Sequence, residues 1–389
     1  MASFYLIAGE ASGDLHGSLL MQGLLQRDPS AKFRFWGGDK MASVAPGLVH
    51  HYKDGAVMGV VEVLAKAGKL RRNLSSCKAD ILAHRPDALI LIDYPGFNLK
   101  IARFAHENGI KVYYYIAPKV WASREGRIAR LKRYVDRMFV IFPFETDYFR
   151  KHGVDVVYEG NPLKDSILSA LDESPSKERF FASCGLDPAR PVVALLAGSR
   201  THEISFLMPR FLELERMAAA GSSAAGAKGG AEALSGCQFV LAAAPSIDDS
   251  LYEGYLKGSS IKLVRDQTYT LLKYSDAAAV ASGTASFETA IIGTPQVVCY
   301  GLNPLTFKIM RAFMKTKYVS LANIILDEMI FSELLQNDCS AANIASELES
   351  LLSNTSRRQK MLSDYARHNA ILGEKGSAQR FASRMIEEL

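Results

Sequence analysis

The sequence predicts an α/β protein of two domains, each built on a doubly wound parallel sheet. A chain of 389 residues is longer than a single ordinary hydrophobic core can organise. Apolar runs of strand length alternate with helical patterns up to Tyr158, and a second alternation begins at Pro191. Residues 164–191, between the two alternations, are mostly polar, as expected for a linker with covering helices.

The composition is that of an ordinary globular protein, with 48% hydrophobic and 22% charged residues. The longest apolar runs, such as 88–92, fall far short of the roughly 18 residues that span a bilayer, and residues 1–4 lack the positive charge of a secretory signal. We therefore expect a cytoplasmic protein. The net charge of +5 suits an anionic substrate or surface and is too weak to indicate nucleic acid. The 5 cysteines are far apart, so we expect core thiols.

The opening residues 5–17 predict a strand, a tight loop and a helix. An apolar run ends at Gly9, and apolar residues recur at helical spacing after Asp14. Glycines around Glu10 and Ser12 allow a ligand close to the backbone, where a helix N-terminus favours an anion. The simpler alternative is an ordinary strand-to-helix turn, with Ser12 or Asp14 as the helix cap. The glycine spacing is not G-x-G-x-x-G, which excludes a nicotinamide-dependent dehydrogenase.

The predicted strands place one carboxylate at a sheet edge in the first domain. We expect strands at 5–9, 32–36, 88–92, 111–116, 137–142 and 155–158, and in the second domain at 191–197, 238–242, 261–264, 277–280 and 296–299. Asp93 directly follows the wholly apolar strand 88–92, and open α/β sheets bind ligands at the carboxyl ends of their strands. Asp93 is therefore a candidate functional residue, with a helix-capping role as the alternative.

The second domain offers polar residues at two strand ends. The first set combines a close-approach glycine, a hydroxyl and a guanidinium beside a helix N-terminus, which suits a diphosphate. In the second set, a residue with a hydroxyl begins a helix. A carboxylate one turn further along this helix can accept hydrogen bonds from both hydroxyls of a ribose. Each is a common loop or cap when taken singly, and together they indicate a bound nucleotide. The residues are Gly198, Ser199, Arg200, Ser282, Gly283, Thr284 and Glu288.

Two segments combine apolar residues with cations. Residues 57–64 are almost wholly apolar and precede several lysines and arginines, and residues 304–315 predict a helix with an apolar face beside three cations. Such segments suit a membrane surface, where apolar side chains enter the acyl region and cations meet anionic headgroups. Burial in the core is the alternative for both. The expected membrane or acyl contacts are Val57, Met58, Val60, Val61, Leu64, Phe307, Met310 and Met314.

The sequence shows no ligand set for a metal-held diphosphate. It contains no Asp-x-Asp, and its 8 histidines show neither i,i+4 pairing nor HExxH. We therefore expect no metal and no other cofactor, with Arg200 and helix dipoles stabilising the charge of a leaving diphosphate.

Short motifs occur along the whole chain at residues 9–17 (GEASGDLHG), 58–64 (MGVVEVL), 92–98 (IDYPGFN), 120–122 (VWA), 142–145 (FPFE), 198–200 (GSR) and 282–284 (SGT). By these motifs the chain resembles the lipid-A-disaccharide synthase family of GT-B glycosyltransferases. The resemblance runs from about Phe4 to Gly373 and leaves out residues 221–236. It implies a GT-B fold, in which two Rossmann-like doubly wound domains face each other across a cleft.

The resemblance also implies a reaction. A 2,3-diacylglucosamine unit would pass from UDP to the 6-hydroxyl of 2,3-diacylglucosamine 1-phosphate, with inversion at the anomeric carbon. Asp93 is then the implied base, and Arg200 with Ser199 would stabilise the departing UDP. Glu288 would hold the ribose. The further implied residues are the catalytic Glu10 and the substrate-binding Ser12, Gly13 and Asn323.

Three positions depart from the family pattern. Gly96 stands where the family usually has Asp, Ala197 replaces a common Pro, and Asn161 replaces a common His. Gly96 removes one alternative base, whereas Asp93 and Arg200 are both present.

The expected domains follow from these assignments. Residues 1–165 form an acceptor- and lipid-side domain against which residues 365–389 pack, and residues 166–364 form a UDP-sugar domain with a flexible surface insertion at 221–236. The expected partners are the two lipid substrates and the anionic inner face of the cytoplasmic membrane, and the choice between monomer and homodimer stays open. Two alternatives remain: a UDP-sugar epimerase of the same fold and a non-catalytic lipid-binding module.

Overall fold

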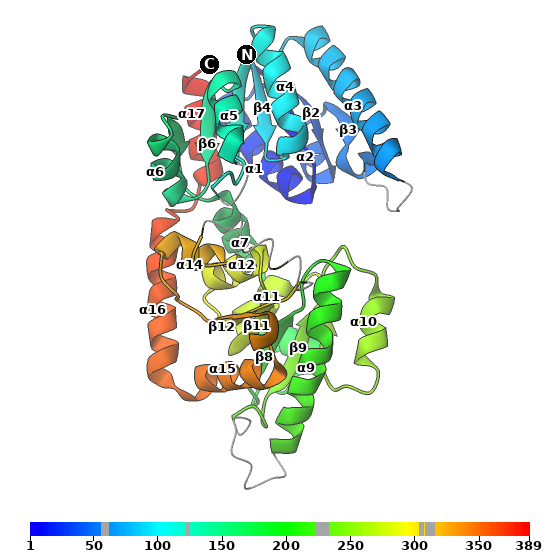
Figure 1. Ribbon diagram of the computed structural model, residues 1–389, viewed down its shortest axis with the longest axis vertical. Coiled ribbons are helices and arrows are strands. Elements are labelled where there is room, and N and C mark those ends of the chain that lie inside the picture. Colours follow the sequence, from blue (N-terminus) through cyan, green and yellow to red (C-terminus); the bar gives the residue numbers. More distant parts are fainter. Residues whose placement is uncertain (56–61, 122–124, 222–232, 303–306, 308–315) are drawn as a thin grey trace. The chain divides into compact units, whose positions relative to one another are not determined.

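The chain folds into two compact units. The computed structural model describes residues 1–55, 62–121, 125–221, 233–302, 307 and 316–389 (Figure 1). One unit comprises Met1–Asp165 and Leu372–Leu389, and the other comprises Ser166–Ile371. The chain therefore passes between the units twice.

The first unit is built on a seven-stranded parallel sheet with the order β3-β2-β1-β4-β5-β6-β7. The strands are β1 (Ser3–Ala8), β2 (Lys32–Gly37), β3 (Leu48–His51), β4 (Ala88–Ile92), β5 (Lys111–Tyr115), β6 (Arg137–Val140) and β7 (Val156–Tyr158). The helices are α1 (Ala11–Arg27), α2 (Asp39–Val44), α3 (Glu62–His84), α4 (Pro95–Glu107), α5 (Ile128–Tyr134), α6 (Pro143–Lys151) and α17 (Ser377–Glu387), with 3-10 turns η1 (Tyr52–Gly55) and η2 (Glu125–Arg127). Because β4 is buried on both faces, it is wholly apolar, as parallel strands between helix layers are.

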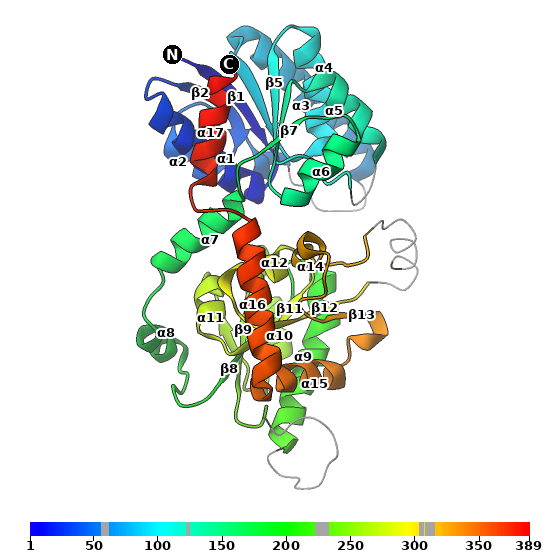
Figure 2. The same ribbon diagram turned by 90° about the vertical axis from the view of Figure 1, so that its left-hand side faces the viewer.

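Helices cover both faces of this sheet. On one face, α3, α4 and α5 bury side chains such as Ile81, Ile101 and Leu131 against the sheet. On the other face, α1 and the C-terminal α17 lie side by side (Figure 2). Gly23 of α1 permits that close approach, because a Cβ there would lie 3.0 Å from the carbonyl oxygen of Ala378.

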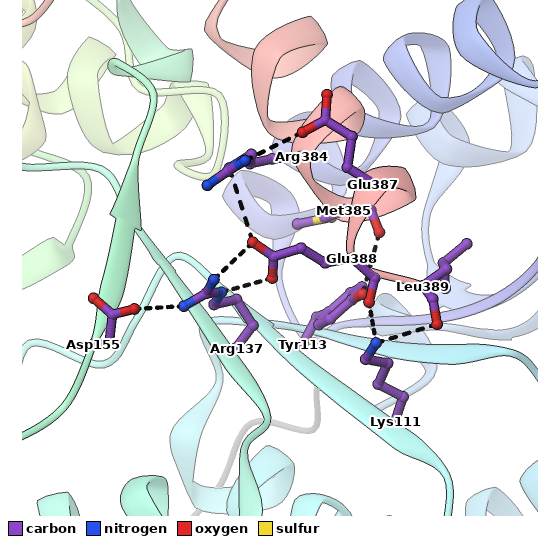
Figure 3. A network of polar contacts seen from close by, with 9 residues as sticks. All are labelled: Lys111, Tyr113, Arg137, Asp155, Arg384, Met385, Glu387, Glu388 and Leu389. Atoms are coloured by element: carbon purple, nitrogen blue, oxygen red, sulfur yellow. Dashed lines mark hydrogen bonds and ion pairs between the residues drawn. The ribbon is translucent and has the colours of Figure 1, made fainter.

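Polar contacts fix the C-terminal helix to the first unit (Figure 3). The Arg137 guanidinium donates to both carboxylate oxygens of Glu388, at 2.6 and 2.8 Å, and also to Asp155 at 2.6 Å. The Tyr113 hydroxyl donates to the Met385 carbonyl at 3.2 Å. At the other end of α17, the Asp165 carboxylate accepts from the backbone N–H groups that begin the helix, with 2.7 Å to the nearest. The last helix is thus part of the first unit's core.

The second unit is built on a six-stranded parallel sheet with the order β10-β9-β8-β11-β12-β13. The strands are β8 (Val192–Leu196), β9 (Gln238–Ala242), β10 (Lys262–Val264), β11 (Ala277–Ala281), β12 (Gln296–Tyr300) and β13 (Glu333–Leu335). The helices are α8 (Lys177–Cys184), α9 (Thr201–Gly221), α10 (Asp249–Leu256), α11 (Thr268–Tyr274), α12 (Thr284–Ile292), α14 (Leu321–Leu326), α15 (Ala341–Ser353) and α16 (Thr355–Ile371), with the 3-10 turn η3 (Gln336–Asp338); α7 (Pro162–Asp172) begins in the first unit and continues into the second. Helices α8 and α11 cover one face, and α15 covers β11 and β12 beside α9.

The predicted fold class is confirmed, since both sheets are parallel and alternate with helices. Residues 365–371, expected with the first domain, instead belong to α16 of the second unit. Of the insertion 221–236, residues 222–232 lie outside the described residues, and Leu234 is fully buried. No helix in the described part of the chain is long and apolar enough to span a membrane.

Candidate functional site

The first sheet reverses its strand order between β1 and β4, and two acidic residues follow these strands. Strands β1 and β4 are neighbours with Ala8 opposite Ile92, while the chain leaves β1 towards β2 and leaves β4 towards β5. Such a switch point opens a crevice at the carboxyl edge, where open α/β sheets bind ligands. Glu10 and Asp93 both lie directly beyond this edge. The sequence predicted both positions from the strand ends.

Asp93 lies in an unusual backbone conformation and a mixed electrostatic environment. Asp93 and Tyr94 have φ angles of 42° and 47°, in the left-handed region that non-glycine residues rarely adopt. Burial raises the pKa of the Asp93 carboxyl, with a smaller contribution from Glu10, whereas the charges of Lys119 and Arg127 lower it. A carboxylate of raised proton affinity is suited to accept a proton from a hydroxyl.

The loop after β1 contacts the loop after β4 directly. A Cβ on Gly9 would lie 2.4 Å from Cγ of Tyr94, so only glycine fits beneath this ring. Tyr94 also stacks on Phe97, with ring centroids 5.5 Å apart. Glu10 and Ser12 are exposed beside this contact, while Gly13 is buried.

The helix caps in the opening loop differ from the alternative offered by the sequence, in which Ser12 or Asp14 caps the first helix. Glu10 precedes α1, and no side-chain hydrogen bond caps that helix. Asp14, which is 2% exposed, instead caps α2: it accepts from the backbone N–H groups of Gly38 at 2.7 Å, Lys40 at 3.0 Å and Met41 at 3.1 Å. The Asp14 carboxylate therefore serves the fold and leaves Glu10 and Ser12 as the exposed polar side chains of the loop.

A buried carboxyl supports the loop after β5. Glu145 accepts from the indole N–H of Trp121 at 3.0 Å and from the backbone N–H groups of Ile141 and Phe142 at 3.2 and 3.1 Å. Complete burial raises the pKa of Glu145 to about 7, and these hydrogen bonds oppose the rise. Glu145 thus ties the segment after Lys119 to the start of α6.

The second sheet has its switch point between β8 and β11, and a pocket of 360 Å³ opens there. Polar lining residues come from the ends of both strands and from the helices that follow, and Ala243, Ala244 and Pro245 after β9 form one wall. The predicted residues in the lining are Gly198, Ser199, Arg200, Ser282, Gly283, Thr284 and Glu288. The structure thus brings all seven together, as parallel strand ends require.

Glu203 organises the arginine side of the pocket. Its carboxylate accepts from the Ser199 N–H at 2.9 Å and from the Arg200 guanidinium at 2.9 Å. Gly198, with φ 99°, is needed here because a Cβ would lie 2.4 Å from a Glu203 oxygen. The Arg200 side chain is 70% exposed, and a guanidinium has five donors, so it can bind an anion while paired with Glu203. Sequence reasoning missed Glu203, although its place three residues after the helix cap is a capping signal.

The opposite side of the pocket carries the carboxyl of Glu288. The hydroxyl of Tyr269 donates to its Oε1 at 3.0 Å, and burial raises the pKa of Glu288. Thr284 is the first residue of α12 and is exposed, so its hydroxyl and the N-terminus of α12 face solvent at the pocket. Tyr269 was missed because no local pattern connects it to a residue 19 positions along.

Comparison with known proteins decides the family. The family model described as lipid-A-disaccharide synthetase matches residues 4–386. The chain belongs to the lipid-A-disaccharide synthase family. It is 38% identical over 386 residues to the lipid-A-disaccharide synthase of Geobacter metallireducens, covering 99% of this chain and 96% of that one.

Solved structures share the chain's fold at low identity. The UDP-GlcNAc 2-epimerase of Neisseria meningitidis bound to UDP-GlcNAc matches with a TM-score of 0.61 and 11% identity, covering 99% of this chain and 98% of that one. MurG of Acinetobacter baumannii matches with a TM-score of 0.59 and 11% identity over the full length of both. At such identity the likeness shows the GT-B fold alone. The epimerase alternative is not favoured, because the family and its named relatives are synthases.

The three departures from the synthase pattern have simple structural settings. A Cβ at Gly96 would meet nothing within 4 Å. Ala197 lines the pocket of the second unit. Asn161 caps α7 through its Oδ1, which accepts from Leu163 N–H at 3.0 Å, and donates to the Ile141 carbonyl at 2.9 Å. None of them removes Asp93 or Arg200.

Other predicted site residues lie elsewhere or outside the described residues. Asn323 is fully buried, with its side chain bonded to Phe331, Ile330 and Glu333, so a substrate contact for it stays a prediction. Val57, Met58, Val60, Val61, Met310, Met314 and the side chain of Leu64 lie outside the described residues, and Phe307 is described only as half-buried. In the part of the chain that the structure describes, no three or more His, Cys, Asp or Glu side chains group as metal ligands do.

Proposed function

We propose that this chain joins UDP-2,3-diacylglucosamine to 2,3-diacylglucosamine 1-phosphate, with inversion at the anomeric carbon, and releases UDP. The observation that carries the proposal is the pocket of the second unit, where a guanidinium, two helix N-termini and a half-buried carboxyl surround a space of 360 Å³. Family membership supports the same reaction class. The UDP-GlcNAc bound to the meningococcal epimerase is consistent with a UDP-sugar here.

In this proposal the second unit binds the donor. Arg200, Ser199 and the start of α9 hold the diphosphate, and the Glu288 carboxylate accepts from the ribose hydroxyls. As the bond between the anomeric carbon and the phosphate oxygen breaks, its electron pair leaves with UDP. Arg200 stabilises this charge more strongly in the transition state than in the bound donor, which lowers the barrier.

The first unit supplies the base. The 6-hydroxyl of the acceptor gives its proton to Asp93 while its oxygen attacks the anomeric carbon from the side opposite UDP, and Glu10 contacts the transferred sugar beside it. The raised pKa of Asp93 supports this role, since it brings the proton affinity of the carboxyl closer to that of a general base. The reaction requires the hydroxyl at Asp93 to reach the sugar whose diphosphate is held at Arg200.

Release of UDP tests the reaction. We expect release only when both diacyl sugars are present, unchanged activity in EDTA, and a loss of at least about 100-fold in kcat for Asp93→Asn and Arg200→Ala. Turnover of UDP-sugar without acceptor would instead indicate an epimerase. Full activity of Asp93→Asn would rule out the base assignment, and loss of activity in EDTA would rule out metal independence.

We further propose that the protein works bound to the inner face of the cytoplasmic membrane. Both substrates carry acyl chains, and residues 57–64 and 304–315 combine apolar side chains with neighbouring cations. Flotation with anionic vesicles tests this: we expect cofloating protein that high salt reduces. Absence of binding even with lipid substrate present would contradict it.

A further inference from the structure

We propose that Asn98 and Tyr114 are positioning residues, which hold the main chain of Asp93 in its left-handed turn and thereby aim its carboxylate at the acceptor hydroxyl. The inference rests on the proposed role of Asp93 as base. It adds two residues, on α4 and β5, that have no part in the chemistry themselves.

The turn at Asp93 needs support. Asp93 and Tyr94 both adopt left-handed conformations, which an L-residue with a Cβ rarely does because the Cβ crowds the following carbonyl oxygen. Two such residues in succession persist only where the surroundings hold them. The side chain of a relaxed, extended Asp93 would leave the strand in a different direction, so the turn decides where the carboxylate points.

The Asn98 side chain supplies the first contact. It is fully buried, and its Nδ2 donates to the carbonyl oxygen of Asp93 at 2.8 Å. The same nitrogen lies 3.2 Å from the Ile92 carbonyl and 3.4 Å from that of Ile7. One amide thus joins the turn to the ends of β1 and β4, the two strands of the switch point.

Tyr114 supplies the second contact from the neighbouring strand. Its hydroxyl donates to the same Asp93 carbonyl oxygen at 2.6 Å. Complete burial raises the pKa of Tyr114 well above its ordinary value, so the hydroxyl remains a donor at every working pH. The Asp93 carbonyl therefore has two donors fixed on different elements, which define its direction.

The adjacent residue provides a matched control. Tyr115 is also fully buried on β5, but its side chain faces α17, where its ring lies 5.3 Å from that of Phe381. Its hydroxyl has no hydrogen-bond partner among the described residues. Tyr114→Phe and Tyr115→Phe therefore remove the same atom from the same strand, and only the first removes a contact with Asp93.

The test compares the two variants by steady-state UDP release across pH. For Tyr114→Phe we expect kcat to fall about fivefold with little change in KM, because one hydrogen bond with a net contribution of about 1 kcal/mol no longer holds the base. We also expect the acid limb of kcat/KM to move to lower pH. Without the bond we expect the carboxyl of Asp93 to be less buried, so that burial raises its pKa by less. Glu10, Lys119 and Arg127 still act on the carboxyl through their charges in this variant. Tyr115→Phe should match the unmodified chain in both respects.

Controls separate this inference from the proposed function and from loss of folding. Thermal unfolding shows how much of each variant is folded, and each rate is divided by that amount. Asn98→Ala removes the other donor and should move the acid limb of kcat/KM in the same direction. Equal kcat and equal pH profiles for the two tyrosine variants would overturn the positioning role, as would a fall in kcat with an unmoved acid limb. If Asp93→Asn itself remains active, the base assignment fails first, and the positioning role fails with it.

Discussion

At the scale of single residues, the charges around Asp93 decide when it can act as a base. Lys119 is exposed and its charge lowers the pKa of Asp93, whereas the charge of Glu10 raises it. A base must be deprotonated, so activity falls as the pH drops through the pKa of the carboxyl. The two neighbours should therefore move the acid limb of the rate profile in opposite directions.

Lys119→Met should shift the acid limb of kcat/KM to higher pH, because the variant loses a charge that favours the carboxylate. Glu10→Gln should shift it to lower pH, since a repelling charge is lost. Lys119→Arg keeps the charge and should leave the limb in place. The profiles are best measured at low ionic strength, because added salt should shrink both shifts. Shifts of the same sign in the two charge-removing variants would contradict this picture.

The sequence patterns identified candidate site residues at strand ends. They did not identify the residues that donate hydrogen bonds to these candidates. Asp93, Arg200 and Glu288 follow apolar runs, and the parallel topology then brings such ends to one edge. Tyr114 and Tyr269 contact them from positions 19–21 residues away, without a local pattern that marks them. Contacts of this kind depend on strand register and side-chain direction, which composition and periodicity do not specify.

At the scale of elements, short edge strands and helix caps are the parts that periodicity describes least well. Strands β3 and β13 were not predicted: both are edge strands of four and three residues, and their side chains are mostly half-buried. Such strands lack the continuous apolar run that marks a central parallel strand. Helix α2, of six residues, similarly depends on a cap from outside its own sequence, the buried Asp14.

Asp14→Ala should destabilise the first unit by about 2–3 kcal/mol, because the backbone donors at the start of α2 lose their buried acceptor. The chain's 2 tryptophans, Trp36 and Trp121, both lie in this unit, so tryptophan fluorescence during urea unfolding reports on it alone. Glu107→Ala, which removes an exposed ion pair with Arg103, should cost less than about 0.5 kcal/mol. Equal costs for the two variants would show that the cap is dispensable.

At the scale of the whole molecule, the chain order and the spatial division differ at the C-terminus. Helix α16 belongs to the second unit, but α17 follows it directly and packs into the first. The Phe381 ring of α17 is fully buried against Tyr115 and Phe139, at centroid distances of 5.3 and 6.0 Å. The sequence indicated that C-terminal helices return to the first domain, but where the return begins depends on side-chain packing around residue 372.

Phe381→Ala should therefore weaken the first unit, although it lies at the far end of the chain from β1. Loss of a buried phenylalanine typically costs about 3–5 kcal/mol. Leu351 is fully buried in α15, so Leu351→Ala is the matched substitution in the second unit. It should destabilise that unit by about 2–5 kcal/mol. Hydrogen exchange should show faster opening of β5 and β6 in the first variant and of β11 and β12 in the second. If each variant accelerated exchange equally in both units, the two units would open as one cooperative body, and the C-terminal helix would act on the whole chain rather than on the unit it completes.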